Sequence, residues 1–424
     1  MMIRFYNGKV MRFSPELRIC SDEVWVDGSI INYVGPGVDN MPEFDRQIDL
    51  HGDLLMPGFK NAHSHSGMTF LRSLADDLPL NDWLSKIVWP NESRLNGEAI
   101  YYLAKLAFME YLTSGITACF DMYYQRDSFL AAVKDSGFRA VICSGMNDFD
   151  EDMEMVERDY LHFNSTGCDR LSYIPGIHGE YTTSLNRMEY VASLAEKYHV
   201  PCFCHLSETR GEVDGCIERY GMTPPQVLDK IGFFKYGGGG FHCCYMSEED
   251  IVLFAEKGLF AVTCPGSNLK LASGIAPIEK MLKSGVNIAI GTDGPASNNA
   301  LDMFREMYLT AALQHIYEDD AAACSADEVL KMACVNGARA CGLNSCDDIA
   351  QGKKADVIVI DMSRPNMQPV TNIISNIVFS GSKNNVRLTM IDGKILYENG
   401  EFFIGESPEN IYSKCNAFVR TIMQ

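Results

Sequence analysis

Two histidines stand one residue apart in the stretch GFKNAHSHSG, residues 58–67. His63 and His65 would share one face of a β-strand, because side chains at positions i and i+2 point the same way. Neutral imidazole is the commonest protein ligand for metal ions. The pair is therefore either half of a metal site or a coincidence, and two histidines alone leave both interpretations open.

Further polar residues follow apolar runs downstream. They are His178 in IHGEYTTS, His205 and Glu208 in CHLSET, His242 in FHCCY and Asp293 in GTDGPASNN. A lone histidine at a strand end is more often structural than a ligand, and an Asp-Gly pair alone indicates a turn. Five of the 9 histidines nevertheless fall at such ends. Independent structural histidines have no reason to gather in this way.

The segments that carry these residues alternate with helical stretches. One apolar segment precedes His63, and seven more span 115–122, 138–146, 171–179, 200–208, 239–246, 259–267 and 286–294. This alternation predicts an α/β protein with a parallel sheet, and eight units predict a (β/α)8 TIM barrel. Active-site groups of such barrels sit at the C-terminal ends of the strands. We therefore expect the polar residues to meet at one mouth.

Both ends of the chain are rich in β-strand signals. Asn7-Gly8 and Asp27-Gly28 near the start, and Asp392-Gly393 near the end, separate apolar runs. Such dipeptides are strong hairpin signals. We expect residues 1–55 and 351–424 to form one small composite β-sandwich domain, and residues 56–350 to form the catalytic barrel.

Charge and composition narrow the class of partner. Lys+Arg 36 against Asp+Glu 56 gives a net charge of -20, which opposes binding to nucleic acid or to an anionic membrane. A small-molecule substrate fits better. The N-terminus lacks a secretory apolar region, and no apolar run approaches the ~18 residues of a membrane helix. We expect a cytoplasmic protein whose 15 cysteines are free.

Two of these cysteines flank candidate ligands. Cys204 precedes His205 and Cys243 follows His242. Strand alternation turns neighbouring side chains to opposite faces. We therefore expect both cysteines to pack in the core rather than bind a metal.

Several stretches together resemble a known family. PGFKNAHSHS, HLSET, FHCCY, PGSNLKLASGIAPI and GTDGPASNN are similar to the amidohydrolase superfamily, more narrowly to its 5-methylthioadenosine/S-adenosylhomocysteine deaminase branch, which also contains chlorotriazine hydrolases. The similarity covers nearly the whole chain. It implies a distorted (β/α)8 barrel with one divalent metal, usually Zn2+, and the ligands His63, His65, His205 and Asp293. LSYIPGIHG offers no lysine for a second metal.

The same resemblance implies a hydrolytic deaminase that acts on C–N bonds in cyclic amidines. Water held at such a metal loses a proton near pH 7. Glu208 would pass a proton to the ring nitrogen beside the reacting carbon. His242 would orient the attacking hydroxide, and Asp293 would accept a proton from water while it remains a ligand.

The residues expected to select the substrate are Glu92, His178 and Ser144. Glu92 in WPNESRL matches the family position that binds ribose hydroxyls, and His178 matches one that contacts the nucleoside sugar. Ser144 stands where S-adenosylhomocysteine deaminases have an arginine for the amino-acid tail, and the following DFDEDMEMVE is acidic. We expect adenosine, 5′-deoxyadenosine or 5′-methylthioadenosine as substrate, and S-adenosylhomocysteine to be disfavoured.

Alternatives remain open at this point. Within the superfamily, the protein could deaminate a free nucleobase, a pterin or another N-heterocycle, or hydrolyse a triazine. A non-catalytic barrel would lack a ligand or the acid, whereas all are present. Polynucleotide deaminases carry H-x-E…P-C-x-x-C, which this sequence lacks. The resemblance also makes a homo-oligomer an expectation.

Overall fold

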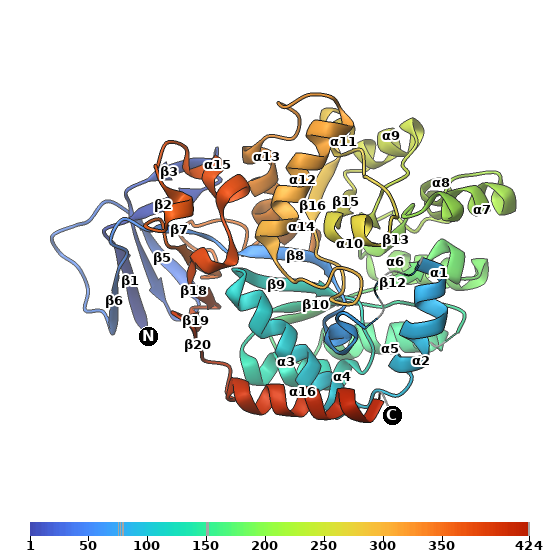
Figure 1. Ribbon diagram of the computed structural model, residues 1–424, viewed down its shortest axis with the longest axis horizontal. Helices are drawn as coiled ribbons and strands as arrows, with labels where there is room; N and C mark the ends of the chain where they lie inside the picture. The colour runs from blue at the N-terminus through green and yellow to red at the C-terminus, as the bar shows by residue number, and fades with distance from the viewer. Residues whose placement is uncertain (75, 77, 79, 150–151, 423–424) are drawn as a thin grey trace.

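The computed structural model describes residues 1–74, 76, 78, 80–149 and 152–422. A barrel of strands and surrounding helices forms its larger part, and sheets from the chain ends lie beside it (Figure 1). The predicted barrel with terminal sheets is thus confirmed.

The barrel strands follow one another in chain order. They are β8 (Phe59–Ser64), β9 (Ile116–Asp121), β10 (Ala140–Cys143), β11 (Leu171–Ile174), β12 (Gly176–Gly179), β13 (Cys202–Leu206), β14 (Gly238–His242), β15 (Phe260–Thr263) and β16 (Asn287–Ile290). They form two parallel sheets, β11-β10-β9-β8 and β12-β13-β14-β15-β16. Each segment predicted as a strand overlaps one of them, except that the fourth overlaps two.

The fourth strand is broken at Pro175, between β11 and β12. Proline has no N–H to donate to a sheet ladder. β11 accordingly pairs with β10, whereas β12 pairs with β13. The amide of His178 bridges the gap by donating to the carbonyl of Met146 at 2.8 Å. At the opposite seam, the amide of Asp293 donates to the carbonyl of His63 at 3.0 Å.

Helices cover the outside of the barrel (Figure 1). They include α3 (Gly97–Thr113), α4 (Arg126–Ser136), α5 (Met153–Phe163), α6 (Leu185–Tyr198), α7 (Arg210–Tyr220), α8 (Pro224–Lys230), α9 (Glu248–Glu256), α10 (Pro265–Lys270), α11 (Ile278–Lys283), α12 (Met303–Tyr317), α13 (Ala326–Lys331) and α14 (Gly337–Ala340). Two short helices, α1 (Leu80–Trp83) and α2 (Trp89–Glu92), interrupt the connection from β8 to α3.

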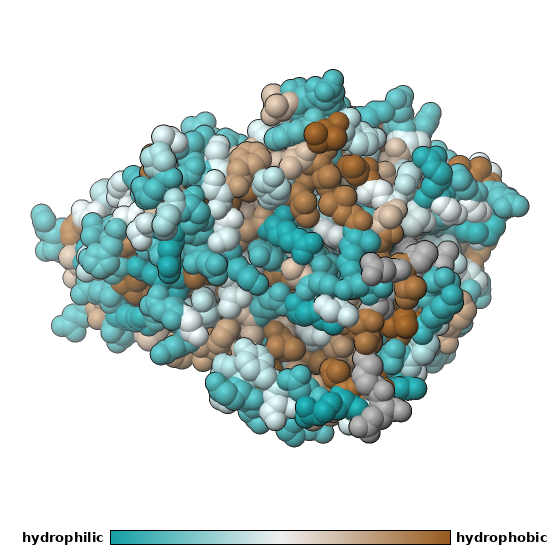
Figure 2. All heavy atoms as spheres, viewed as in Figure 1, coloured by the Kyte–Doolittle hydropathy of each residue, from teal (hydrophilic) through white to brown (hydrophobic). Residues whose placement is uncertain are grey.

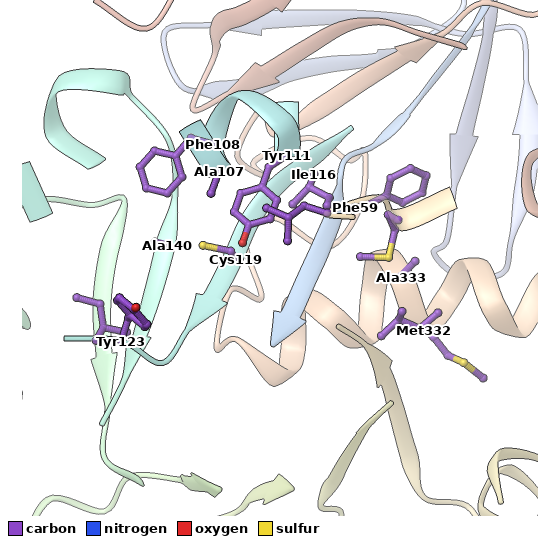
Figure 3. Close-up of a cluster of buried hydrophobic side chains, with 14 of the residues drawn as sticks. Phe59, Ala107, Phe108, Tyr111, Ile116, Cys119, Tyr123, Ala140, Met332 and Ala333 are labelled. Atoms are coloured by element: carbon purple, nitrogen blue, oxygen red, sulfur yellow. The ribbon is translucent and has the colours of Figure 1, made fainter. Parts of the chain in front are cut away.

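Aromatic side chains fill the layer between α3 and the sheet. Figure 3 shows Tyr111 of α3 beside Ile116 and Cys119 of β9. Phe108 is fully buried, and its ring stacks on Phe138 with centroids 4.5 Å apart. This packing fixes the first strands of the barrel, which carry the first two histidines.

The terminal strands form two sheets. One has the order β5 (Ile30–Gly35), β4 (Glu23–Asp27), β1 (Met2–Tyr6), β6 (Arg46–Asp49). The other has the order β20 (Glu401–Phe402), β19 (Lys394–Glu398), β18 (Val386–Ile391), β17 (Val357–Ile360), β7 (Leu54–Pro57), β2 (Lys9–Arg12), β3 (Arg18–Cys20). Side chains from both sheets share one apolar core that includes Phe5, Val24, Leu55 and Val357.

Two of the three predicted hairpins are present. Asp27-Gly28 joins the antiparallel pair β4 and β5, and Asp392-Gly393 joins β18 and β19. Asn7-Gly8 does not form a hairpin, because β1 and β2 belong to different sheets. Asn7 has a φ of 58°, and a Cβ on Gly8 would lie 2.5 Å from the Cβ of Leu50. The dipeptide therefore turns a tight corner between the two sheets.

The C-terminal helix α16 (Pro408–Ile422) lies along α3 at the edge of the barrel (Figure 1). Just before it, Glu406 accepts a hydrogen bond from the buried Nζ of Lys105 at 2.8 Å. The division of the chain after residues 55 and 350 stays a prediction. That division groups α16 with the terminal sheets, although the helix packs on the barrel.

The exposed face of the molecule is mostly hydrophilic (Figure 2), and the cysteines are free as predicted. Figure 2 shows hydrophilic side chains over most of the visible face, with hydrophobic ones gathered over α11 and α12. Among the described residues, no helix is both long and apolar enough to cross a bilayer. All the cysteines are free, and Cys204 and Cys243 lie in the apolar core as predicted.

Candidate metal and catalytic site

The predicted polar residues meet at the C-terminal ends of the barrel strands. Those placed on or directly after a strand are His63 and His65 at β8, His205 and Glu208 at β13, His242 at β14 and Asp293 at β16. All six are buried. The structure thus brings together residues that are more than two hundred positions apart in the chain.

The backbone bends sharply at three of these strand ends. Ser207, His242 and Asp293 have φ values of 49°, 73° and 60°. Residues other than glycine rarely adopt this left-handed conformation, and it costs free energy. Strained backbone of this kind clusters at functional sites. We therefore interpret the bends as what turns the side chains of Glu208, His242 and Asp293 toward the mouth of the barrel.

Four donor atoms lie at the spacing that one metal ion requires. Nε2 of His65 is 3.3 Å from Nε2 of His205 and 3.3 Å from Oδ1 of Asp293. Nε2 of His63 is 3.5 Å from the same Oδ1. Ligands bound tetrahedrally to zinc at ~2.0–2.1 Å are separated by ~3.3 Å. Two overlapping clusters can hold an ion, one of His63, His65 and Asp293, the other of His63, His205 and His242.

The chemistry of these donors also fits a cation. His63 is fully buried, and neither of its ring nitrogens makes a hydrogen bond to any described residue. A buried polar group without a partner requires an explanation. Burial lowers the pKa of His63 to about 3, which keeps the imidazole neutral. Burial opposes ionisation of Asp293, but its contact with His63 and the neighbouring histidines outweigh this and lower its pKa.

Hydrogen bonds behind the donors hold the rings in place. Nδ1 of His65 lies 2.6 Å from the carbonyl of Met122, and Nδ1 of His205 lies 2.7 Å from that of His178. With Nδ1 engaged, each ring presents Nε2 to the cluster, the arrangement typical of ligating histidines. Asp293 accepts hydrogen bonds through Oδ2 from Ser267 at 2.5 Å and from Ser297 at 2.8 Å.

Glu208 and His242 stand next to the donor cluster. One carboxylate oxygen of Glu208 accepts a hydrogen bond from Ser273 at 2.7 Å, and the other lies 3.8 Å from Nε2 of His242. Nδ1 of His242 lies 2.7 Å from Oδ1 of Asn268. An acid and an imidazole therefore face each other beside the candidate metal position.

A cavity opens above these residues at the mouth of the barrel. Its lining contains His65, His178, His205, Glu208, His242 and Asp293. Glu92, at the end of α2, also lines it. Burial lowers the pKa of His178 to about 4, so this ring is neutral at pH 7.

The structure does not bring Ser144 to this cavity. Its hydroxyl is fully buried, donates to the carbonyl of Gly176 at 2.8 Å and accepts from the amide of Gly176 at 2.7 Å. Ser144 thus links β10 to the broken fourth strand. In the acidic stretch 148–157, residues 150–151 lie outside the described part of the chain.

Other residues of the cavity wall were not singled out from the sequence. The aromatic ones are Trp83, Trp89, Tyr123, Tyr124 and Tyr181. Arg126, at the start of α4, also lines the cavity and donates to Asp159 at 2.7 Å. A buried tryptophan or arginine outside a strand end carries no periodic signal, so only the folded chain reveals these contacts.

A barrel with this cluster of histidines and one carboxylate at its mouth is the architecture of a metal-dependent hydrolase. The model of the Amidohydrolase family matches residues 54–396. The 5-methylthioadenosine/S-adenosylhomocysteine deaminase of Thermococcus sibiricus is 39% identical over 402 residues, 93% of this chain and 94% of that protein.

Solved structures agree with this assignment. An adenosine deaminase from Xanthomonas campestris with bound zinc superposes with a TM-score of 0.93 at 31% identity, covering 100% of this chain and 98% of the other. Atrazine chlorohydrolase from Arthrobacter aurescens, complexed with zinc, has a TM-score of 0.90 at 22% identity over 98% of this chain and 100% of the other, which shows the shared fold.

The chain belongs to the amidohydrolase family, and within it to the 5-methylthioadenosine/S-adenosylhomocysteine deaminase family. It is a metal-dependent hydrolase of the deaminase type.

Proposed function

We propose that the protein is a Zn2+-dependent deaminase that converts the 6-amino group of an adenine nucleoside to a 6-oxo group and releases ammonia. The nucleoside is of the adenosine, 5′-deoxyadenosine or 5′-methylthioadenosine type. One observation carries the proposal: a single cavity is lined by three of the four donor residues, by Glu208 and His242, and by Glu92 and His178. A single cation held by His63, His65, His205 and Asp293 would supply an activated water near neutral pH.

The chain's own side chains then handle protons and charge. Glu208 would carry a proton to the ring nitrogen next to the reacting carbon, which makes that carbon a better electrophile. General acid–base help of this kind contributes roughly 10²–10⁴-fold. His242 would orient the attacking water through Nε2, because Nδ1 is engaged by Asn268. Asp293 would accept the proton that the water loses.

The outer part of the cavity supports a nucleoside as substrate. Glu92 and His178 line the cavity, where Glu92 would accept hydrogen bonds from ribose hydroxyls and neutral His178 would share a hydrogen bond with the sugar. The aromatic wall offers flat surfaces for a purine.

The amino-acid tail of S-adenosylhomocysteine is disfavoured. Ser144 does not reach the cavity, and the guanidinium of Arg126 is ion-paired with Asp159. A carboxylate on the substrate would have to compete with Asp159 for Arg126. A neutral 5′ substituent meets no such competition.

Where the protein acts and whether it assembles are part of the same proposal. The free cysteines support a cytoplasmic location, and the negative net charge supports a small-molecule substrate over nucleic acid or membrane. A homo-oligomer stays a prediction from the family resemblance.

A substrate panel tests the proposal directly. Ammonia release by zinc-loaded protein would be measured for adenosine, 5′-deoxyadenosine, 5′-methylthioadenosine, S-adenosylhomocysteine, free adenine and guanine, a pterin and a chlorotriazine. We expect the highest kcat/KM for the nucleosides with a neutral 5′ position. A preference for S-adenosylhomocysteine would refute the argument about the tail, and activity confined to free bases, pterins or triazines would refute the nucleoside assignment.

Loss of a ligand should remove both metal and activity. His63→Ala is expected to lower the zinc content well below one ion per chain and ammonia release by at least about 10²-fold, since the metal supplies the reactive water. The exposed His162 offers a matched control, because His162→Ala should leave zinc content and kcat unchanged. A His63→Ala protein with full zinc and activity contradicts the proposed site.

A further inference from the structure

Glu212 is a buried carboxyl group to which the proposed reaction gives no role. It lies in the first turn of α7 and is 5% exposed. Burial raises its pKa to about 8. A carboxyl group in such surroundings is costly unless specific hydrogen bonds compensate, so its contacts indicate why it is there.

Both oxygens of Glu212 bind the backbone that leads to α7. The amide of Ser207 donates to Oε1 at 2.7 Å, and the amide of Glu208 donates to Oε2 at 2.8 Å. The amide of Glu212 in turn donates to the side chain of Thr209, the residue that caps α7, at 3.2 Å. The side chain and the backbone of Glu212 therefore both hold the turn between β13 and α7.

The turn that Glu212 closes is strained. Ser207 adopts a left-handed φ of 49°, a conformation that persists only where surrounding contacts enforce it. Its carbonyl accepts from the amide of Tyr245 at 2.9 Å, but its amide depends on Glu212. Loss of this contact would allow Ser207 to relax and the adjoining Glu208 to move.

We propose that Glu212 is a positioning residue that fixes the backbone of Glu208 so that its carboxylate reaches the substrate. Ser273 holds only one oxygen of that carboxylate, and this single hydrogen bond cannot fix the backbone. The inference rests on the proposed role of Glu208 as the proton carrier. It requires no particular heterocycle, because any deamination at this site needs the same proton.

Glu212→Gln tests the role of the two hydrogen bonds between Glu212 and the backbone. The side chain keeps its size, but one oxygen becomes an NH2 group, which cannot accept from a backbone amide. One of the two contacts is lost and replaced by two donors that face each other. Glu218 lies exposed on the same helix, so Glu218→Gln makes the identical chemical change away from the turn.

A double-mutant cycle separates positioning from a merely structural effect. Wild type, Glu212→Gln, Glu208→Gln and the double variant would be compared for kcat, KM and zinc content, with the best substrate from the panel. We expect Glu212→Gln to lower kcat about 10- to 100-fold, the effect of misplacing a reacting group by about 1 Å. KM and zinc content should stay unchanged. In the Glu208→Gln background the same change should cost less than about twofold, since there is no carboxylate left to position.

Each outcome decides the question. Equal losses of kcat in both backgrounds, loss of zinc, or full activity of Glu212→Gln would overturn the inference. If Glu212→Gln does not fold, the cycle is repeated with Glu212→Asp, which keeps both oxygens one methylene further back. Failure of both variants to fold makes the residue structural and also overturns the inference. A wild type without deaminase activity, or a Glu208→Gln variant as active as wild type, would instead refute the proposed function.

Discussion

The imidazole of His242 is oriented by one amide side chain. Oδ1 of Asn268 lies 2.7 Å from Nδ1 of His242, and both residues are buried. An acceptor at Nδ1 selects the tautomer whose Nε2 is free to accept a proton. The tautomer of the imidazole proposed to orient the attacking water is therefore set by a residue of α10.

Removal of this acceptor should weaken catalysis without removing the metal. Asn268→Ala is expected to lower kcat about 10- to 100-fold, because the ring loses its orientation and its preferred tautomer. Steady-state ammonia release with parallel zinc analysis measures both. Asn344, which is exposed, supplies the comparison, and Asn344→Ala should behave as wild type. A wild-type kcat for Asn268→Ala would show that His242 needs no such partner.

The sequence predicts residues at strand ends better than the residues that orient them. His63, His205 and Asp293 stand where an apolar run stops, so the barrel topology alone brings them together. Asn268 and Glu212 lie inside helical turns, and nothing in their spacing indicates which strand end they contact. Those contacts depend on loop conformations, such as the left-handed φ of Ser207, that the hydrophobic pattern does not specify.

Helix α3 packs aromatic side chains against the first strands of the barrel. Phe108 stacks on Phe138 and meets the edge of Phe129, with centroids 4.5 and 5.5 Å apart. None of these rings lines the cavity. The helix therefore contributes to stability rather than to chemistry.

Truncation of this ring should separate stability from catalysis. Phe108→Ala is expected to reduce the free energy of unfolding by about 3–5 kcal/mol, the usual cost of a phenylalanine deleted from a core. Denaturant unfolding measures it, and kcat at a temperature where the variant stays folded should match wild type. Phe403 is 49% exposed, so Phe403→Ala should cost far less. Similar losses for both variants would contradict the packing argument.

Among the elements, the pattern of apolar residues predicts strands reliably where a strand is buried on both faces. β9 and β13 fall inside their predicted segments because long apolar runs specify such strands. The Asn7-Gly8 corner was mistaken for a hairpin because the same dipeptide suits any tight turn with a positive φ. Only the pairing partners of β1 and β2, which lie elsewhere in the chain, distinguish the two cases.

The barrel and the terminal sheets are joined by a buried ion pair. Nε and Nη2 of Arg139, just before β10, donate to Asp356, just before β17, at 2.6 and 3.0 Å. Burial alone would raise the pKa of Asp356, but the charge and hydrogen bonds of Arg139 outweigh it and lower the pKa below 3.8. The pair therefore stabilises the fold above about pH 4, and this stabilisation is lost as the pH falls through the lowered pKa.

This pair should dominate the coupling between the two parts of the molecule. Arg139→Met leaves Asp356 buried without its partner and is expected to cost about 3–5 kcal/mol at pH 7. The difference from wild type should shrink as the pH falls, because the unpaired Asp356 of the variant takes up a proton first and the wild-type Asp356 follows only below its lowered pKa. Urea unfolding at pH 7, 5 and 3.5 tests this. Arg364 is mostly exposed beside Asp361, and Arg364→Met should show a much smaller, salt-sensitive loss. A difference that is independent of pH would exclude the ion pair as its source.

The wall of the cavity comes from several separate segments of the chain, and two of them differ in what they contribute. The groups proposed to perform the reaction sit on β8, β13, β14 and β16, whereas Trp83, Trp89 and Glu92 come from the short connection between β8 and α3. Mutations of Trp83, Trp89 and Glu92 leave the strand ends untouched. A protein of this architecture can therefore change its substrate by remodelling this connection while the groups at the strand ends stay the same, since connecting segments tolerate change better than the elements they join.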